Sequence, residues 1–217
     1  MMSLAIHECR MLGRRAVWPA ALVVHAAAAS MFVAIWGPSG GVSLWEATVL
    51  QQLSAVDRLA TAVLLTWLST FVCSDDEGGA RSVLDWSALA ARSPQTVFRA
   101  RIAAIAVLGL IFMSTALPAF VAAGEVSAAP MREVAGQIAA AFGFACLCLG
   151  VTSVASVLVH DRVAVWCSAM ALCLLAAVGV RLLDTTLLRA AVPAIMGVVL
   201  LALAPAGVGD RGRLNGD

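Results

Sequence analysis

Long runs of apolar residues, with short polar joints between them, restrict the fold of this chain more than any other feature of its sequence. The clearest run covers residues 16–36, twenty-one residues without an Asp, Glu, Lys or Arg. As an α-helix it would rise about 30 Å, the thickness of the hydrocarbon core of a bilayer. Hydrophobic residues make up 62% of the sequence and charged residues only 12%, against about 25% charged in soluble domains. The chain is therefore expected to be an all-α, polytopic membrane protein.

Six runs of this kind predict six membrane-spanning helices within a single domain, residues 1–217. The first run contains AAAAS, residues 26–30, which is similar to the cleavage site of a secretory signal, but it continues to Trp36 and so favours an uncleaved span. Pro118 and Pro193 are expected to kink their helices. The predicted spans are residues 16–36 and 59–73 within the segment 16–73, then residues 102–124, 134–159, 163–180 and 190–206 within the segment 102–206.

An adjacent pair of opposite charges, Asp57 and Arg58, interrupts the second run and allows two interpretations. In the first, the pair lies at the outer water boundary, so that residues 47–56 form an interfacial piece and residues 59–73 make most of the span. In the second, the pair lies deeper and marks a functional polar site, because charges inside a membrane are costly and seldom idle. The boundary interpretation is favoured, since residues 59–73 are nearly long enough to cross.

The arginines predict the orientation, because cytoplasmic segments of membrane proteins are enriched in basic residues. Six spans place both ends on one side. If that side is the cytoplasm, ten arginines lie in cytoplasmic segments, and only three, or four with Arg58, lie outside. The sequence therefore predicts a multi-pass protein of the inner (plasma) membrane with both termini cytoplasmic. The ten are Arg10, Arg14, Arg15, Arg81, Arg92, Arg99, Arg101, Arg162, Arg211 and Arg213, and the three are Arg132, Arg181 and Arg189.

Both ends of the chain are polar and are expected to lie outside the bilayer. Residues 1–15 mix basic and apolar residues, which predicts an amphipathic helix on the membrane surface. Residues 207–217 are expected to form a disordered cytoplasmic tail. The charged residues of the predicted surface helix are Glu8, Arg10, Arg14 and Arg15.

The longest polar interruption covers residues 74–101 and is cytoplasmic in this orientation. It holds four acidic and four basic residues. Val83, Trp86 and Leu89 recur every three residues, with Leu84 beside them, so a helix here would have an apolar edge. One interpretation is a short helix outside the bilayer that docks on a partner. The other is an ordinary solvated loop.

The motifs of soluble-type catalysis are absent from the sequence. It contains no HExxH, no GxSxG and no Walker phosphate loop, and its histidines, His7, His25 and His160, are far apart. His7, Glu8 and Cys9 are adjacent, but helix neighbours point about 100° apart, which is poor geometry for one metal. The net charge of +1 argues against a nucleic-acid partner. The chain is expected to be no enzyme and to hold no metal or cofactor, so any nucleotide must be bound by another chain.

Taken together, these parts resemble the permease subunit of the type-2 ABC exporter family over essentially the whole chain. Such permeases have a basic surface helix, six spans, cytoplasmic ends and one large inner loop between the second and third spans. The loop carries acidic residues followed by glycine, a short coupling helix, a proline, and a basic residue where the chain re-enters the membrane. The corresponding parts here are Asp75, Asp76 and Glu77 with Gly78 and Gly79, then residues 83–91, Pro94, and Arg99 or Arg101.

The resemblance implies a transport protein that works with other chains. An ABC ATP-binding subunit would bind ATP and push on the coupling helix, and a second permease subunit, identical or different, would complete the translocation path. The compact chain is similar to the haem-export permeases of cytochrome c maturation, and an apolar path without buried charges would suit lipids, hydrophobic peptides, drugs or haem. The residues implied to contact the ATPase are Asp76, Glu77, Gly79, Val83, Leu84, Trp86, Leu89 and Arg92.

Two questions stay open at the level of sequence. The same polar segment could hold a cytoplasmic partner in a membrane scaffold or assembly factor that transports nothing. Pairs of small residues allow helices to approach closely, either between two permease subunits or within one bundle. These pairs are Ala139 with Gly143 and Gly150 with Ser153.

Overall fold

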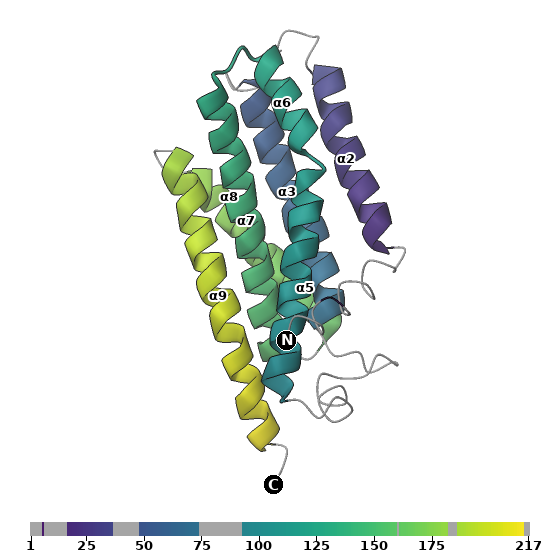
Figure 1. Ribbon diagram of the computed structural model, residues 1–217, viewed down its shortest axis with the longest axis vertical. Helices are drawn as coiled ribbons and strands as arrows, with labels where there is room; N and C mark the ends of the chain where they lie inside the picture. The colour runs from purple at the N-terminus through teal and green to yellow at the C-terminus, as the bar shows by residue number, and fades with distance from the viewer. Residues whose placement is uncertain are drawn as a thin grey trace.

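The structure, a computed structural model, describes residues 17–36, 48–73, 93–159, 161–181 and 186–214, together with Ile6. Every regular element in these ranges is an α-helix, which confirms the all-α prediction for the described part of the chain. The helices form one bundle (Figure 1). They are α2 (Val17–Trp36), α3 (Val49–Cys73), α5 (Pro94–Ser114), α6 (Leu117–Val126), α7 (Met131–Leu158), α8 (Arg162–Arg181) and α9 (Thr186–Leu214).

Five of these segments have the length and apolar composition of membrane spans: α2, α5 together with α6, α7, α8 and α9. Their outward faces carry large apolar side chains, such as Val23 of α2, Leu175 of α8 and Ile195 of α9, all more than half exposed. A surface of this kind suits hydrocarbon, because contiguous apolar patches are rare on soluble monomers. The chain is therefore a multi-pass membrane protein.

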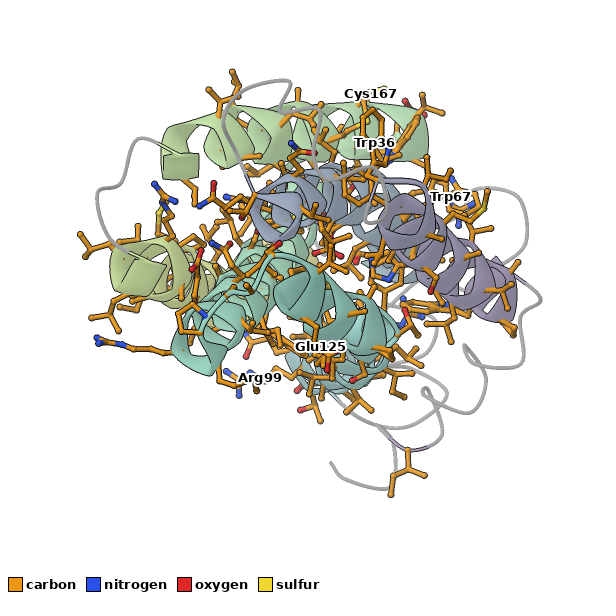
Figure 2. The ribbon with its side chains drawn as sticks, turned by 90° about the horizontal axis from the view of Figure 1, so that it is seen from above. Trp36, Trp67, Arg99, Glu125 and Cys167 are labelled. Atoms are coloured by element: carbon orange, nitrogen blue, oxygen red, sulfur yellow. The ribbon has the colours of Figure 1, made fainter. Side chains whose placement is uncertain are left out.

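α3 occupies the middle of the bundle. It packs against α2, α5, α6, α7 and α8. Figure 2 shows the bundle from above, with α8 on one side of α3 and with α5 and α6 on the other. α3 has 25 residues, about 37 Å of helix, and runs without a break from Val49. The prediction of a separate interfacial piece at residues 47–56 is therefore wrong.

Polar side chains on α3 are accommodated within the apolar bundle by bonding to their own helix. The hydroxyl of Ser69 donates to the carbonyl of Leu65 at 2.6 Å, and the hydroxyl of Thr70 donates to the carbonyl of Thr66 at 2.7 Å. Each hydroxyl thus donates to a carbonyl of the preceding helical turn, which provides the hydrogen bond that water cannot supply inside the bundle. Buried leucines fill the spaces between these groups: Leu50, Leu53, Leu65 and Leu68.

The third predicted span is longer than residues 102–124 and is broken in its second half. Ser93 caps α5, its hydroxyl accepting the Thr96 N–H at 3.3 Å, and Pro94 occupies the first turn. α5 ends at Ser114, and α6 starts two residues after Thr115 with Pro118 in its first turn. A proline cannot donate to the turn before it, so the helix breaks there, as predicted for Pro118. α9 by contrast continues as one helix through Pro193.

Glycines bring α7 and α9 into backbone contact. A Cβ atom added at Gly143 would collide with the carbonyl oxygen of Ala190, and one at Gly150 would lie 2.6 Å from the carbonyl oxygen of Gly197. A Cβ at Gly197 would in turn collide with the backbone of Cys146. Gly143 and Gly150 therefore serve packing within one bundle, which is one of the two uses that the sequence left open.

Several predictions concern parts of the chain at or beyond the described ranges. The predicted surface helix of residues 1–15 lies outside them apart from Ile6, and so does the predicted coupling helix of residues 83–91. α9 runs on to Leu214, so the prediction of a disordered tail is wrong for residues 207–214. A helix already formed extends without a new nucleation step, which is why a glycine-rich sequence can continue it.

Candidate functional site

A buried pair, His25 and Asp57, joins α2 to α3 inside the bundle. Nε2 of His25 lies 3.0 Å from Oδ1 of Asp57. On the other side of the ring, Nδ1 lies 2.8 Å from Oγ1 of Thr115, the residue that follows α5. His25 is 1% exposed and Asp57 3% exposed, so both are enclosed by protein. Three separate segments of the chain thus meet at one imidazole ring.

The spacing of residues in α2 places His25 on the face toward the bundle. Trp18, Ala21, His25 and Ala29 follow one another at intervals of three or four residues, and all four are buried. Residues with this spacing share one face of a helix. Phe112 of α5 stacks on the imidazole with the ring centroids 4.0 Å apart and the planes 18° from parallel. The ring is therefore fixed both by its hydrogen-bond partners and by its stacking partner.

The break between α5 and α6 supplies the threonine. Thr115 is the C-cap of α5, and its Oγ1 also lies 2.7 Å from the carbonyl oxygen of Phe112. The hydroxyl has a single hydrogen and two neighbours that can accept it, the Phe112 carbonyl and Nδ1 of His25. If Nδ1 accepts it, Nδ1 carries no hydrogen, and if the Phe112 carbonyl accepts it, Nδ1 can carry a hydrogen and donate it to Oγ1.

Arg58, the residue after Asp57, is also buried and bonds one turn back along α3. Its Nε donates to the carbonyl oxygen of Ser54 at 3.0 Å, and its Nη2 donates to the hydroxyl oxygen of Ser54 at 3.2 Å. Ser54, Asp57, Arg58 and Thr61 are all buried and recur with the spacing of one helical face. α3 therefore directs a polar, partly charged stripe into the interior of the bundle.

The pair lies near the middle of α2. His25 is eight residues from Val17 and eleven from Trp36, about 12 Å and 16 Å along the axis, which is well inside a ~30 Å hydrocarbon core. Asp57 shares this depth because it contacts His25. The favoured interpretation, which placed Asp57 and Arg58 at the water boundary, is therefore wrong, and the burial of both residues agrees with the second interpretation, in which the pair lies deeper. Asp57 can lie at this depth because His25, on a neighbouring helix, provides it with a hydrogen-bond partner there.

One oxygen of the pair, Oδ2 of Asp57, is buried and has no hydrogen-bond partner among the described residues. A buried polar atom left without a partner raises the free energy of the fold, and more so when it carries charge. Ionisable groups inside a membrane commonly mark proton relays or the paths of ions and substrates. No third His, Cys, Asp or Glu in the described ranges joins this pair in a metal-ligand group.

The cluster contains none of the residues that the sequence singled out as contacts of a partner or of the membrane surface. The predicted ATPase contacts, Asp76, Glu77, Gly79, Val83, Leu84, Trp86, Leu89 and Arg92, lie outside the described residues, as do Glu8, Arg10, Arg14 and Arg15 of the predicted surface helix.

Two arginines at the end of the polar segment of residues 74–101 lie in the first half of α5. Arg99 is exposed and projects from the edge of the bundle in Figure 2, whereas Arg101 is buried. His25 and Thr115 were not predicted as site residues. The signal that could have found the histidine is its place at the centre of an uncharged run, opposite a second run that contains an aspartate.

No protein-family model, no curated protein and no solved structure matches this chain.

Proposed function

We propose that the chain is the transmembrane permease subunit of an ATP-driven exporter of the type-2 ABC kind. In this proposal α3 is a sixth span, both termini are cytoplasmic, and the protein resides in the inner membrane. A separate ABC subunit binds ATP, and a second permease subunit faces this one across the translocation path. The chain itself is not an enzyme and holds no cofactor.

The observation that supports this proposal is the connection between the charged segment and the buried cluster. α3 carries Asp57 and ends at Cys73, where residues 74–92 begin, and these lead directly into α5. α5 ends at Ser114, and its C-cap residue Thr115 contacts the same histidine as Asp57. The segment that resembles a coupling helix is thus joined at both ends to helices that meet at the polar centre of the bundle.

This connection gives a mechanical route for transport. A force on residues 74–92 acts on the inner ends of α3 and α5, which are packed helices and transmit displacement along their axes. α5 is anchored at that end by Val97 and Phe98, which pack against Ala204 of α9. Movement of α3 relative to α5 changes the contacts of His25, since the ring bonds to both. ATP-driven closure of the partner subunits would in this way reach mid-membrane.

Co-purification from native membranes tests the proposal. We expect an ABC ATP-binding subunit to accompany the tagged chain. The double variant Trp86→Ala/Leu89→Asp should reduce its recovery at least tenfold, because buried aromatic and aliphatic anchors carry most of the free energy of an interface. Asp85→Asn, on the polar side of the same stretch, is the matched control and should retain the partner.

Recovery of the chain without any ATP-binding subunit contradicts the exporter proposal, provided that the chain remains in the membrane fraction. Full retention of the partner by the double variant contradicts the assignment of the docking residues. Retention of a different cytoplasmic protein through Trp86 and Leu89 would instead support the scaffold alternative.

A further inference from the structure

We propose that His25, Asp57 and Thr115 form an intramembrane binding site for a single proton. The site has hydrogen-bond partners for two protonation states without any displacement of its heavy atoms. It does not depend on an ATP-binding partner, and so its test is independent of the one above.

The state without the extra proton uses Thr115 as a donor. The Thr115 hydroxyl hydrogen then points to Nδ1 of His25, 2.8 Å away, so Nδ1 carries no hydrogen. The hydrogen of the neutral imidazole is on Nε2 and is donated to the carboxylate oxygen Oδ1 of Asp57 at 3.0 Å. The Phe112 carbonyl is still satisfied, because it accepts the Thr115 backbone N–H at 3.2 Å.

The state with the extra proton uses Thr115 as an acceptor. The hydroxyl rotates about its Cβ–Oγ1 bond and donates to the Phe112 carbonyl at 2.7 Å. Nδ1 gains the incoming proton and donates it to Oγ1. The hydrogen between Nε2 and Oδ1 remains in place, closer either to the histidine or to the aspartate. One N–H bond forms, none is lost, and the net change is the uptake of one proton from water.

Two features of the cluster act in opposite directions on this uptake. Arg58 balances the charge of Asp57 in the state without the extra proton, here called the unloaded state. The cluster with the extra proton, the loaded state, therefore has a charge of +1 in a medium that disfavours charge. Oδ2 of Asp57 has no partner in the described part of the chain, so the unloaded state leaves an ionised oxygen unsatisfied. In the loaded state the hydrogen between Nε2 of His25 and Oδ1 of Asp57 can move to Asp57, which neutralises the carboxylate and reduces the cost of the unsatisfied oxygen.

Arg58 follows Asp57 directly, whereas the arginines of α5 lie away from the pair along their helix. Arg101 precedes Thr115 by fourteen residues, about 21 Å along α5, and Glu125 of α6 is exposed. α2 has no Asp, Glu, Lys or Arg. The ionisable residues of the helices packed around the pair, besides Asp57, are Arg58 and Cys73 on α3, Arg99 and Arg101 on α5, Glu125 on α6, Arg132, Glu133, Cys146 and Cys148 on α7, and Arg162, Cys167, Cys173 and Arg181 on α8.

The ring nitrogens of His25 report the two states directly. The full chain, labelled with ¹⁵N-histidine in lipid nanodiscs, has only three histidines, and the signals of His25 are those missing from His25→Gln. The spectra are recorded from about pH 8 down to about pH 5, and we expect Nδ1 to gain a hydrogen as the proton concentration rises. Nε2 should remain hydrogen-bonded throughout.

Variants separate the proposed roles. Thr115→Val removes the hydroxyl and should weaken proton binding about tenfold, because losing one hydrogen bond to a charged group lowers a binding constant by about that factor. Thr115→Ser keeps the hydroxyl and should titrate like the wild type. Asp57→Asn should weaken uptake by more than tenfold. Thr152→Val is the matched control, because the Thr152 hydroxyl bonds only within α7, to the Cys148 carbonyl.

A fixed state of the His25 ring over this pH range overturns the proposal. So does a titration that is equal in the wild type, Thr115→Val and Asp57→Asn. If Thr115→Val or Asp57→Asn fails to fold, the wild-type titration and Thr115→Ser decide the matter alone, since serine preserves the hydroxyl that the proposal requires.

Discussion

Asp57 and Arg58 are neighbours in sequence, yet their hydrogen bonds go to different parts of the bundle. The aspartate contacts His25 on α2, and the arginine bonds to Ser54 on its own helix. Consecutive helical residues point about 100° apart, which explains the divergence. Such groups lose hydration on burial, so each depends on the partners that the fold gives it.

A double-mutant cycle on the pair measures that dependence. His25→Leu and Asp57→Leu should each lower the free energy of unfolding by about 3 kcal/mol, since each leaves a buried partner unpaired. The double variant should lose at least about 1 kcal/mol less than the sum of the two, the usual size of coupling between residues in contact. Unfolding from mixed micelles into denaturing detergent gives these free energies.

The control for this cycle is Thr66→Val, which removes a buried hydroxyl that bonds only to carbonyls of α3. Its cost should be close to 0.6 kcal/mol, about the average for hydrogen bonds in membrane helices. Additive losses in the double variant would show that His25 and Asp57 do not stabilise one another.

At the scale of helices, α7 and α9 depend on residues that lack a side chain. Gly143 allows the carbonyl of Ala190 to approach where a Cβ atom would lie, whereas a Cβ at Gly179 of α8 would meet nothing within 4 Å. The same chemical change at these two glycines therefore has opposite consequences. One is crowded by backbone, which cannot rotate away, and the other faces open space.

Gly143→Ala should destabilise the bundle by about 1 to 3 kcal/mol, the usual cost of overpacking. Gly179→Ala should be neutral or stabilise by up to about 1 kcal/mol, because alanine is the better helix former. Both values come from detergent unfolding of the single chain. Equal stability of the two variants, with altered subunit association only for Gly143→Ala, would return Gly143 to a contact between subunits.

The sequence predicts helices well where the bilayer alone sets their length. The span predicted at residues 16–36 is observed as Val17–Trp36, because an uncharged run has one way to cross. The sequence-based prediction fails for α3, which starts at Val49. Considered without the neighbouring helices, the charged pair of Asp57 and Arg58 resembles a boundary with water. The contact between His25 and Asp57, 32 residues apart, exists only once α2 and α3 are packed.

For the whole molecule, the central question of topology is whether α3 crosses the membrane. An aspartate and an arginine at the centre of a span each cost about 3 kcal/mol on insertion scales, while each leucine contributes about 0.5 kcal/mol in favour. α3 is thus a weak span by itself. Its enclosure by α2, α5, α6, α7 and α8 indicates that the neighbouring helices hold it in place.

Reporter fusions distinguish five spans from six. With α3 spanning and the amino terminus cytoplasmic, alkaline phosphatase fused after Gly79 should be inactive, because the enzyme matures only outside the cytoplasm. The same reporter fused after Ser127, between α6 and α7, should be active, and a fluorescent protein after Asp217 should fluoresce. If α3 does not cross, position 79 lies outside and its phosphatase becomes active. That result would place the charged segment beyond the reach of a cytoplasmic ATPase, so it contradicts the six-span topology and the exporter proposal together, while the proton site of His25 would still stand or fall by its own titration.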